Sequence, residues 1–298
     1  MDHSAPVRRC FLAVPAINAR MVEKAKTIKV DALFLDLEDS VPAAQRSQAR
    51  DNLAAEVSGL DKTSRGFVTP NLAIRINEVS SDDFVKDIEL LKSGIGSAID
   101  SVILPKVNSA ADLDRLEREL QEIEKSLGLI EGAIGIDAQI ETAMGLRNAD
   151  VIAAHPRVIS LSFGPLDFLA DLLIPTTDPE SAPIDLINYA LIKILISARA
   201  AGIAVFDGPT VDYKDLDGLA IKCQRAVHLG IDGKWAIHPD QIETITNAFT
   251  PSPDTYKEAV DLLAAFADNK AGAFTYNGVM VDAATLRMAQ HIVGRGEK

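Results

Sequence analysis

Two acidic residues follow consecutive apolar segments of the chain. Glu141 comes directly after the run 133–140 (AIGIDAQI), and Asp167 follows the run 158–164 (VISLSFG). If each run is a strand of a parallel barrel, both carboxylates lie on the same rim, where the carboxyl ends of the strands meet. Carboxylate oxygens are preferred ligands of hard divalent cations. The spacing therefore predicts a metal site on this rim; the competing interpretation is two solvated loop acids.

The segments around these acids repeat along the chain. Short apolar runs rich in Val, Ile, Leu and Phe are typical of strands buried on both faces, and we expect them at 11–16, 32–37, 72–76, 101–107, 133–140, 158–163, 203–206 and 234–237. Helical patterns lie between and after them, at 20–29, 42–57, 81–92, 109–127, 143–154, 183–200, 216–229 and 240–248. Eight strand–helix repeats predict a (β/α)₈ TIM barrel. A doubly wound open sheet is the alternative, but the turn after its first strand would be rich in glycine, and this turn reads PAINAR.

Several predicted helices carry recognisable end signals. Ser109 precedes the helix 109–127 with Asp112 at the spacing of a capping box. Gly128, Gly202 and Gly230 directly follow three predicted helices, where glycine commonly ends a helix. These signals support the helix boundaries that the barrel requires.

Composition limits the class of protein. At 298 residues the chain can form one barrel over residues 1–250 followed by a tail over residues 251–298. With 47% hydrophobic residues the chain can bury a large core, and its two cysteines fit a reducing, cytoplasmic location. A net charge of −13 disfavours nucleic acid as a partner, and no apolar run is long enough to predict a membrane span. The irregular segment 175–183, beside Asp167, is a candidate lid or an ordinary surface loop.

Further charged residues lie at the other strand ends. Arg75 lies inside an apolar strand (IRIN), where a charge is costly unless it is paired. Its partner is either a protein carboxylate, Asp36 or Glu38 of the segment LDLEDS, or the carboxylate of a ligand, which suits the planar guanidinium. Asp39 of the same segment joins this group at the rim. Arg75 beside two metal-binding acids favours metal-stabilised enolate chemistry.

Three more residues at strand ends are expected to support the site. Lys106 ends the fourth strand (ILPKV) and Asp207 the seventh, and both are predicted to hold the rim network together; a Schiff base on Lys106 is the alternative. His238 precedes a proline at a helix start, which favours a capping or supporting role over metal ligation.

Motifs along the chain resemble those of one known family. The stretches FLAVPA, FLDLEDSV, IRIN, ILPKV, QIETAMGL, FGPLDFLADL, IHPDQI and GAFTYNGVMVD are similar to those of the citrate lyase β-subunit-like family, CoA-ester lyases of the HpcH/HpaI aldolase superfamily. The family includes malyl-CoA, citramalyl-CoA and citryl-CoA lyases. The resemblance covers about residues 8 to 290. It implies a TIM barrel with a helical C-terminal extension over residues 251–298, a lid that contacts a neighbouring subunit, and assembly as a homo-oligomer, a trimer or a hexamer.

The resemblance also implies roles for single residues. It implies that Glu141 and Asp167 hold Mg²⁺, with Mn²⁺ as an alternative, and that Arg75 grips a carboxylate or carbonyl oxygen of the substrate. It implies that Asp282, in the MVD motif of the tail, reaches a neighbouring subunit's site for acid–base chemistry. The competing interpretation of Asp282 is the N-cap of a helix over 283–292.

The chain departs from the family pattern in two places. Leu166 precedes the metal-binding Asp167 where the family often has a glutamate, and Ala16 replaces a glycine of the first loop. That loop lies near the CoA phosphates in relatives, so Arg20 is a candidate phosphate contact, and a solvated arginine is the alternative.

The function implied is a Mg²⁺-dependent carbon–carbon lyase. It would cleave a carboxylated 3-hydroxyacyl-CoA into a 2-oxoacid and an acyl-CoA, or run the reverse condensation, so its partners would be a CoA thioester and a 2-oxoacid. Two alternatives are a metal-dependent hydroxy-oxoacid aldolase acting on free acids and a non-catalytic subunit of a lyase complex. The tail with Asp282 disfavours the first, and the intact group of Arg75, Glu141 and Asp167 disfavours the second.

Overall fold

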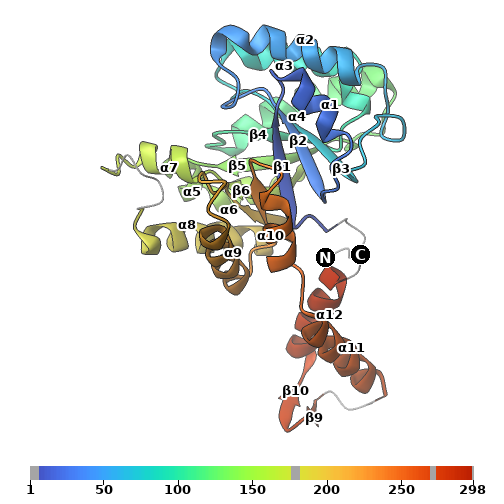
Figure 1. The fold of residues 1–298 in the computed structure, drawn as a ribbon, viewed down its shortest axis with the longest axis vertical. Helices are drawn as coiled ribbons and strands as arrows, with labels where there is room; N and C mark the ends of the chain where they lie inside the picture. The colour runs from blue at the N-terminus through green and yellow to red at the C-terminus, as the bar shows by residue number, and fades with distance from the viewer. Residues whose placement is uncertain (1–6, 176–181, 269–272, 297–298) are drawn as a thin grey trace.

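The centre of the molecule is a closed barrel of parallel strands. The computed structural model describes residues 7–175, 182–268 and 273–296 (Figure 1). Eight strands pair in chain order, and the last pairs with the first. They are β1 (Cys10–Pro15), β2 (Ala32–Asp36), β3 (Asn71–Arg75), β4 (Ser101–Leu104), β5 (Gly135–Ile140), β6 (Val158–Phe163), β7 (Ala204–Asp207) and β8 (Gly233–Ala236). The predicted (β/α)₈ barrel is confirmed, while the candidate lid 175–183 falls largely outside the described residues.

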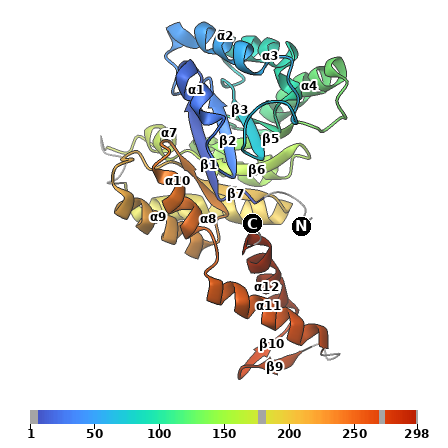
Figure 2. The same cartoon turned by 45° about the vertical axis from the view of Figure 1, so that its right-hand side comes forward.

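Helices between the strands cover the outside of the barrel (Figures 1 and 2). They are α1 (Ala19–Ala25), α2 (Arg46–Val57), α3 (Asp82–Lys92), α4 (Ala110–Leu127), α5 (Ala143–Arg147), α6 (Ala149–Ala153), α7 (Pro165–Asp171), α8 (Ile184–Ala201), α9 (Leu216–Leu229) and α10 (Gln241–Ala248), with short 3₁₀ turns η1 (Ala43–Gln45) and η2 (Ile95–Ser97). Within the described parts of the chain, no helix has the length and apolarity needed to cross a membrane.

The element boundaries differ from the predicted ones where local chemistry intervenes. The predicted helix 143–154 is two short helices, α5 and α6, because Asn148 leaves helical geometry (ψ 9°) and its side chain donates to the carbonyl of Asn108 at 2.7 Å. Strand β4 ends before Pro105, which has no N–H for the sheet. Helix α7, which begins at Pro165, was not predicted.

The helix ends that carry capping signals in the sequence are confirmed. The backbone N–H of Ser109 donates to the carboxylate of Asp112 at 2.9 Å, which completes the capping box of α4. Gly128, Gly202 and Gly230 each have a left-handed backbone at the end of α4, α8 and α9.

Aromatic side chains fill the inside of the barrel. The ring of Phe34 lies 5.2 Å from that of Phe11 and 4.7 Å from that of Trp235, and Phe206 completes the cluster. Arg8, which precedes β1, pairs with the buried carboxylate of Asp137 at 2.9 Å and covers the ring of Phe206. These groups close the barrel at the end where its strands begin. A larger apolar cluster lies between the strands and the helices.

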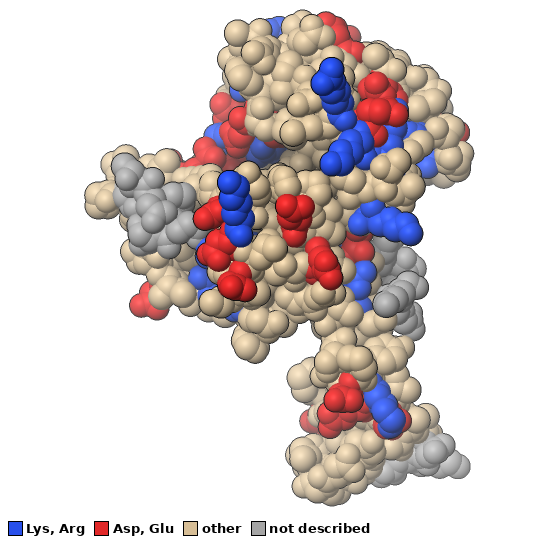
Figure 3. Space-filling model, viewed as in Figure 1, with Lys and Arg blue, Asp and Glu red and all other residues tan. Residues whose placement is uncertain are grey.

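The C-terminal segment forms an arm that stands away from the barrel (Figures 1, 2 and 3). It consists of α11 (Pro253–Asp268), an antiparallel hairpin of β9 (Phe274–Tyr276) and β10 (Val279–Val281), and α12 (Ala283–Gly296). The hairpin turn has Asn277 and Gly278 at φ 47° and 81°, as a tight two-residue turn requires. The last helix was expected from the sequence, whereas the hairpin and α11 were not.

One arginine anchors the arm to the barrel. The guanidinium of Arg295 donates to the carbonyl of Asp232 at 2.5 Å and to that of Phe249 at 3.1 Å. Asp232 directly precedes β8, so this contact lies at the end of the barrel where the strands begin. The arm is therefore anchored at the end of the barrel opposite to Glu141 and Asp167.

The closure of the barrel generates a stability prediction. A Cβ atom on Gly233 would lie 2.5 Å from the carbonyl oxygen of Arg8 and 2.6 Å from that of Arg9, whereas a Cβ on Gly294 would meet no atom within 4 Å. Gly233→Ala should lower the free energy of unfolding by about 2 kcal/mol, because the backbone across the β1–β8 seam has to move. Gly294→Ala, in the helix α12, should raise it by up to about 1 kcal/mol. Urea unfolding measures both, and equal effects would contradict the close approach at the seam.

Candidate active site

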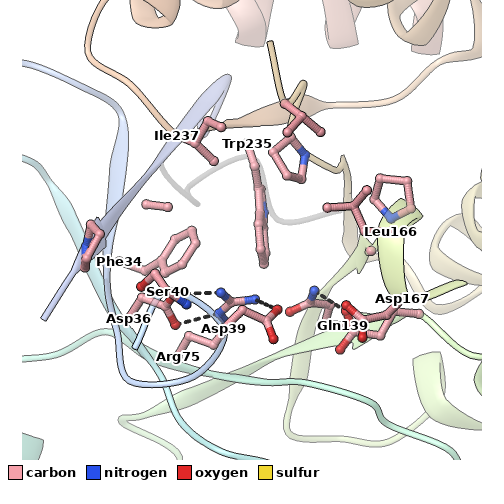
Figure 4. A pocket seen from close by; sticks show the side chains of 17 residues that line it. Phe34, Asp36, Asp39, Ser40, Arg75, Gln139, Leu166, Asp167, Trp235 and Ile237 are labelled. Carbon is pink, nitrogen blue, oxygen red and sulfur yellow. Dashed lines mark hydrogen bonds and ion pairs between the residues drawn. The ribbon is translucent and has the colours of Figure 1, made fainter. Parts of the chain in front are cut away.

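A cavity of about 270 Å³ opens at the carboxyl ends of the barrel strands (Figure 4). Its polar wall consists of Asp36, Asp39, Ser40, Arg75, Gln139, Glu141 and Asp167. Its apolar wall includes Phe34, Leu166, Trp235 and Ile237. In Figure 4 Arg75 lies between Asp36 and Asp39, and Gln139 and Asp167 continue the same wall towards Leu166. The structure thus brings together the three residues on which the sequence analysis depended, Arg75, Glu141 and Asp167.

Arg75 is held by carboxylates of the protein. It is the register neighbour of Asp36 across β2 and β3, and its Nε and Nη2 donate to the two oxygens of Asp36 at 2.7 and 2.6 Å. Its Nη1 donates to Asp39 at 3.1 Å and lies 3.1 Å from an oxygen of Glu38. These three hydrogen bonds use three of its five N–H groups. Arg75 is therefore fixed by a structural ion pair and still has N–H groups to offer a ligand in the cavity.

Glu141 is fully buried and held at both oxygens. The backbone N–H of Lys106 donates to Oε1 at 2.8 Å, and the side-chain amide of Gln139 donates to Oε2 at 2.5 Å. Gly164 leaves the space for it, because a Cβ there would lie 2.3 Å from Oε2. Burial raises the pKa of Glu141 to about 8. A nearby cation would stabilise the charged form of this buried carboxyl group.

Gln139 is a site residue that the sequence analysis missed. It lies two positions before Glu141 on β5, so both side chains face the inside of the barrel. The sequence contained a signal for it: a polar side chain two positions before Glu141, in a strand that was expected to be buried on both faces. Gln139 Oε1 has no hydrogen-bond partner among the described residues.

Asp167 and Lys106 complete the polar rim. Asp167 lies in the first turn of α7, and its side chain is 36% exposed. The ammonium of Lys106 lies 2.7 Å from Glu38 and 3.5 Å from Asp167. Burial raises the pKa of Glu38 to about 7. Burial alone would lower the pKa of Lys106, but the carboxylates of Glu38 and Glu141 raise it above its usual range, so the side chain is an ammonium and not a free amine.

Two residues expected to support the rim have other partners. Asp207 does not join the rim network: β8 places Lys234 beside it, and the ammonium donates to its carboxylate at 2.7 Å. His238 stacks on Tyr213 with ring centres 4.6 Å apart, and its Nδ1 accepts the N–H of Asp240 at 3.2 Å. His238 thus has a local role at the start of α10.

The remaining candidates lie outside the cavity. Arg20 is exposed in the first turn of α1, directly after β1. Asp282 is half-buried, and its carboxylate accepts the N–H groups of Ala284 and Thr285 at 2.9 and 3.1 Å, which makes it the N-cap of α12. Because the arm is anchored at the opposite end of the barrel, Asp282 does not reach the cavity of its own chain.

A second group of side chains, away from the cavity, could hold a metal ion. Asp114 and Glu117 of α4 and His155 have ligand atoms within 4.8 Å of one another. However, His155 Nδ1 accepts the N–H of Arg157 at 3.3 Å, so in the neutral ring Nε2 carries the proton, which faces the two carboxylates. This arrangement suits a hydrogen-bonded cluster better than a metal centre.

The cavity suits a hard cation. Glu141 and Asp167 supply carboxylate oxygens, and the amide oxygen of Gln139 adds a third oxygen, which accepts no hydrogen bond from the part of the chain that the structure describes. Oxygen donors of this kind are the set that Mg²⁺ prefers.

Comparison with known proteins agrees with this geometry. The chain is 33% identical to the L-malyl-CoA/beta-methylmalyl-CoA lyase of Cereibacter sphaeroides, over 97% of this chain and 94% of that protein. It is 31% identical to the mitochondrial citramalyl-CoA lyase of Rattus norvegicus, over 98% of this chain and 87% of that protein.

Solved structures give the same result. Protein CitE from Mycobacterium tuberculosis, in complex with magnesium, acetoacetate and coenzyme A, superposes with a TM-score of 0.76 at 30% identity, over 97% of this chain and 98% of that one. Residues 9–239 match the model of the family HpcH/HpaI aldolase/citrate lyase. The chain therefore belongs to the HpcH/HpaI aldolase/citrate lyase family.

Proposed function

We propose that this protein is a Mg²⁺-dependent carbon–carbon lyase of CoA esters. It cleaves a carboxylated 3-hydroxyacyl-CoA of the malyl-CoA, citramalyl-CoA or citryl-CoA type into a 2-oxoacid and an acyl-CoA, or catalyses the reverse condensation. The observation that carries the proposal is the presence of Arg75, Glu141 and Asp167 in one cavity at the strand ends. The similarity to malyl-CoA and citramalyl-CoA lyases along nearly the whole chain supports the substrate class.

Arg75 binds and orients the oxoacid half of the substrate. Asp36 accepts two hydrogen bonds from the guanidinium of Arg75. The N–H groups of Arg75 that remain free bind a carboxylate of the substrate or the substrate oxygen on which negative charge develops. Because the group is fixed before the substrate arrives, little reorganisation is needed during the reaction.

Glu141 and Asp167 hold the Mg²⁺, with Mn²⁺ as an alternative ion. When bound, the metal acts as a Lewis acid that favours loss of the substrate hydroxyl proton and stabilises charge on the oxygen that becomes the oxoacid carbonyl. Gln139 and the backbone N–H of Lys106 fix the orientation of Glu141. As the carbon–carbon bond breaks, its electron pair passes to the acyl-CoA half as an enolate. The apolar wall with Phe34 and Trp235 surrounds this half and limits water.

Asp282 of a neighbouring subunit, a carboxylate at the start, accepts the hydroxyl proton and passes it to the enolate carbon; in the reverse direction it removes a proton from that carbon and returns it to the oxygen. Two observations support this assignment: the arm leaves its own barrel at the end opposite to the cavity, and its hairpin exposes Val279 and Met280 at 65% and 72%. Exposed apolar side chains of this size favour contact with another subunit. The assembly is a homo-oligomer, a trimer or a hexamer, in which residues 251–298 cover the site of a neighbour.

The CoA portion of the bound substrate extends out of the cavity across the rim. Arg20, exposed after β1, lies at the end of the barrel where the cavity opens and is the candidate contact for a CoA phosphate. A cytoplasmic location is part of the proposal, since both cysteines are buried and unpaired.

The first prediction tests the function and the metal together. Purified protein should cleave at least one of malyl-CoA, citramalyl-CoA and citryl-CoA with Mg²⁺, and lose this activity with a chelator. Glu141→Gln and Asp167→Asn should each lower kcat/KM by about a hundredfold or more, because the metal stabilises charge worth several kcal/mol in the transition state. Circular dichroism checks that the variants fold. Near wild-type activity of either variant at low Mg²⁺ would reject the two-carboxylate site, and no cleavage of any of the three esters would reject the function.

The second prediction concerns the anchor of Arg75. Asp36→Asn removes a buried negative partner and should lower the free energy of unfolding by about 3 kcal/mol, together with kcat/KM. Asp39→Asn is the matched control: it contacts the same guanidinium, but its side chain is 48% exposed, so the loss should stay below about 1 kcal/mol. Urea unfolding of both variants makes the comparison, and equal losses would mean that Asp36 is not the anchor.

The third prediction concerns Asp282. Asp282→Asn should keep the stability of the protein, because asparagine caps a helix as well as aspartate does, but lower the rate by about a hundredfold or more. Inactive Asp282→Asn and Glu141→Gln chains, dissociated and reassembled together, should recover part of the activity, since some sites then receive an intact half from each chain. Verified mixed oligomers without recovery would rule out the shared site, and a fully active Asp282→Asn protein would leave the residue only its capping role.

A further inference from the structure

The side chain of Lys106 lies in the middle of the carboxylate cluster at the rim. Four carboxylates surround its ammonium, at 2.7 Å (Glu38), 3.5 Å (Asp167), 3.9 Å (Asp39) and 4.0 Å (Glu141). Glu38 and Glu141 are buried, so solvent screens their charges poorly. A cation at this position compensates charges that would otherwise repel one another.

The backbone of Lys106 is unusual for a lysine. Its φ is 50°, in the left-handed region that residues with a side chain rarely occupy. Two hydrogen bonds hold this conformation: its N–H donates to Glu141 at 2.8 Å, and its carbonyl accepts from the side chain of Asn108 at 3.0 Å. A strained backbone that places a charged group in a functional cluster often serves that function.

The ammonium shares its partners with the metal. Mg²⁺ binds carboxylate oxygens at about 2.1 Å, and Glu141 and Asp167, its proposed ligands, are both within 4.0 Å of Lys106 Nζ. Two cations that share the same two carboxylates in a partly buried site repel each other strongly. Each therefore weakens the binding of the other.

We propose that Lys106 is an internal counter-cation of this cluster that competes with Mg²⁺ for Glu141 and Asp167. When Mg²⁺ binds, the ammonium moves away from these two carboxylates and keeps its contacts with Glu38 and Asp39. Lys106 thus stabilises the protein before the metal binds and lowers the affinity for the metal. The inference rests on the proposed function, because it takes Glu141 and Asp167 as the metal ligands.

The test compares two lysines in similar surroundings. Lys106→Met removes the ammonium from the cluster. Lys26→Met is the control: Lys26 also bridges two carboxylates, those of Glu23 and Glu56, and its side chain is 21% exposed against 25% for Lys106, but neither carboxylate is a proposed metal ligand. Calorimetric titration with MgCl₂ at mildly alkaline pH gives the Kd, and thermal unfolding with chelator or with Mg²⁺ gives the change in Tm.

Lys106→Met should bind Mg²⁺ at least about tenfold more tightly than the wild type, because the competing charge is gone. Its Tm should fall in chelator, and Mg²⁺ should raise it by more than it raises the Tm of the wild type. Lys26→Met should lower Tm equally under both conditions with an unchanged Kd. Lys106→Gln, which keeps a donor for Glu38, repeats the titration if the Met variant does not fold in chelator.

The outcomes separate the two proposals. An Mg²⁺ affinity of the Lys106 variants that equals or falls below that of the wild type would overturn the counter-cation role. Wild-type protein that shows neither a heat of binding nor a shift in Tm with Mg²⁺ would instead overturn the metal site itself, and with it the function proposed above.

Discussion

Five carboxylates share two cationic side chains at the carboxyl end of the barrel, and the site depends on this balance of charge. Asp36 fixes Arg75, while Lys106 faces the other members, Glu38, Asp39, Glu141 and Asp167. Burial raises the pKa of Glu38 to about 7 and that of Glu141 to about 8, and the neighbouring carboxylates act in the same direction. The position of Arg75, the protonation of the cluster and its affinity for a further cation are therefore coupled.

The sequence predicted the parts of the site that follow from strand order. Glu141 and Asp167 were recognisable because each follows a buried strand, and Arg75 because a charge inside an apolar strand needs a partner. The place of Lys106 at the rim followed from its position at the end of a strand. Its four carboxylate contacts could not be predicted, since they depend on a left-handed backbone that is unusual for lysine. The partner of Asp207 depends on the register between β7 and β8, which brings Lys234 beside it. The course of the arm depends on how Arg295 docks, a tertiary contact without a local signal.

The aromatic layer inside the barrel separates two groups of charged residues. Arg8 and Asp137 pair at the end where the strands begin, and Arg75 lies at the other end, 5.7 Å above the rings of Phe34 and Trp235. The rings restrict the movement of the guanidinium and exclude water from its lower side. A rigid base of this kind explains how a strongly charged cluster keeps one geometry.

The same aromatic layer limits the route by which substrates enter the cavity and products leave it. With Phe11, Phe34, Phe206 and Trp235 filling the barrel, and Arg8 across its far end, the cavity is a blind hole with one mouth. In the proposed reaction the small oxoacid lies at the bottom, on Arg75, and the long thioester fills the mouth. The two products then depart in a fixed order, the acyl-CoA before the oxoacid, and in the condensing direction the oxoacid enters first.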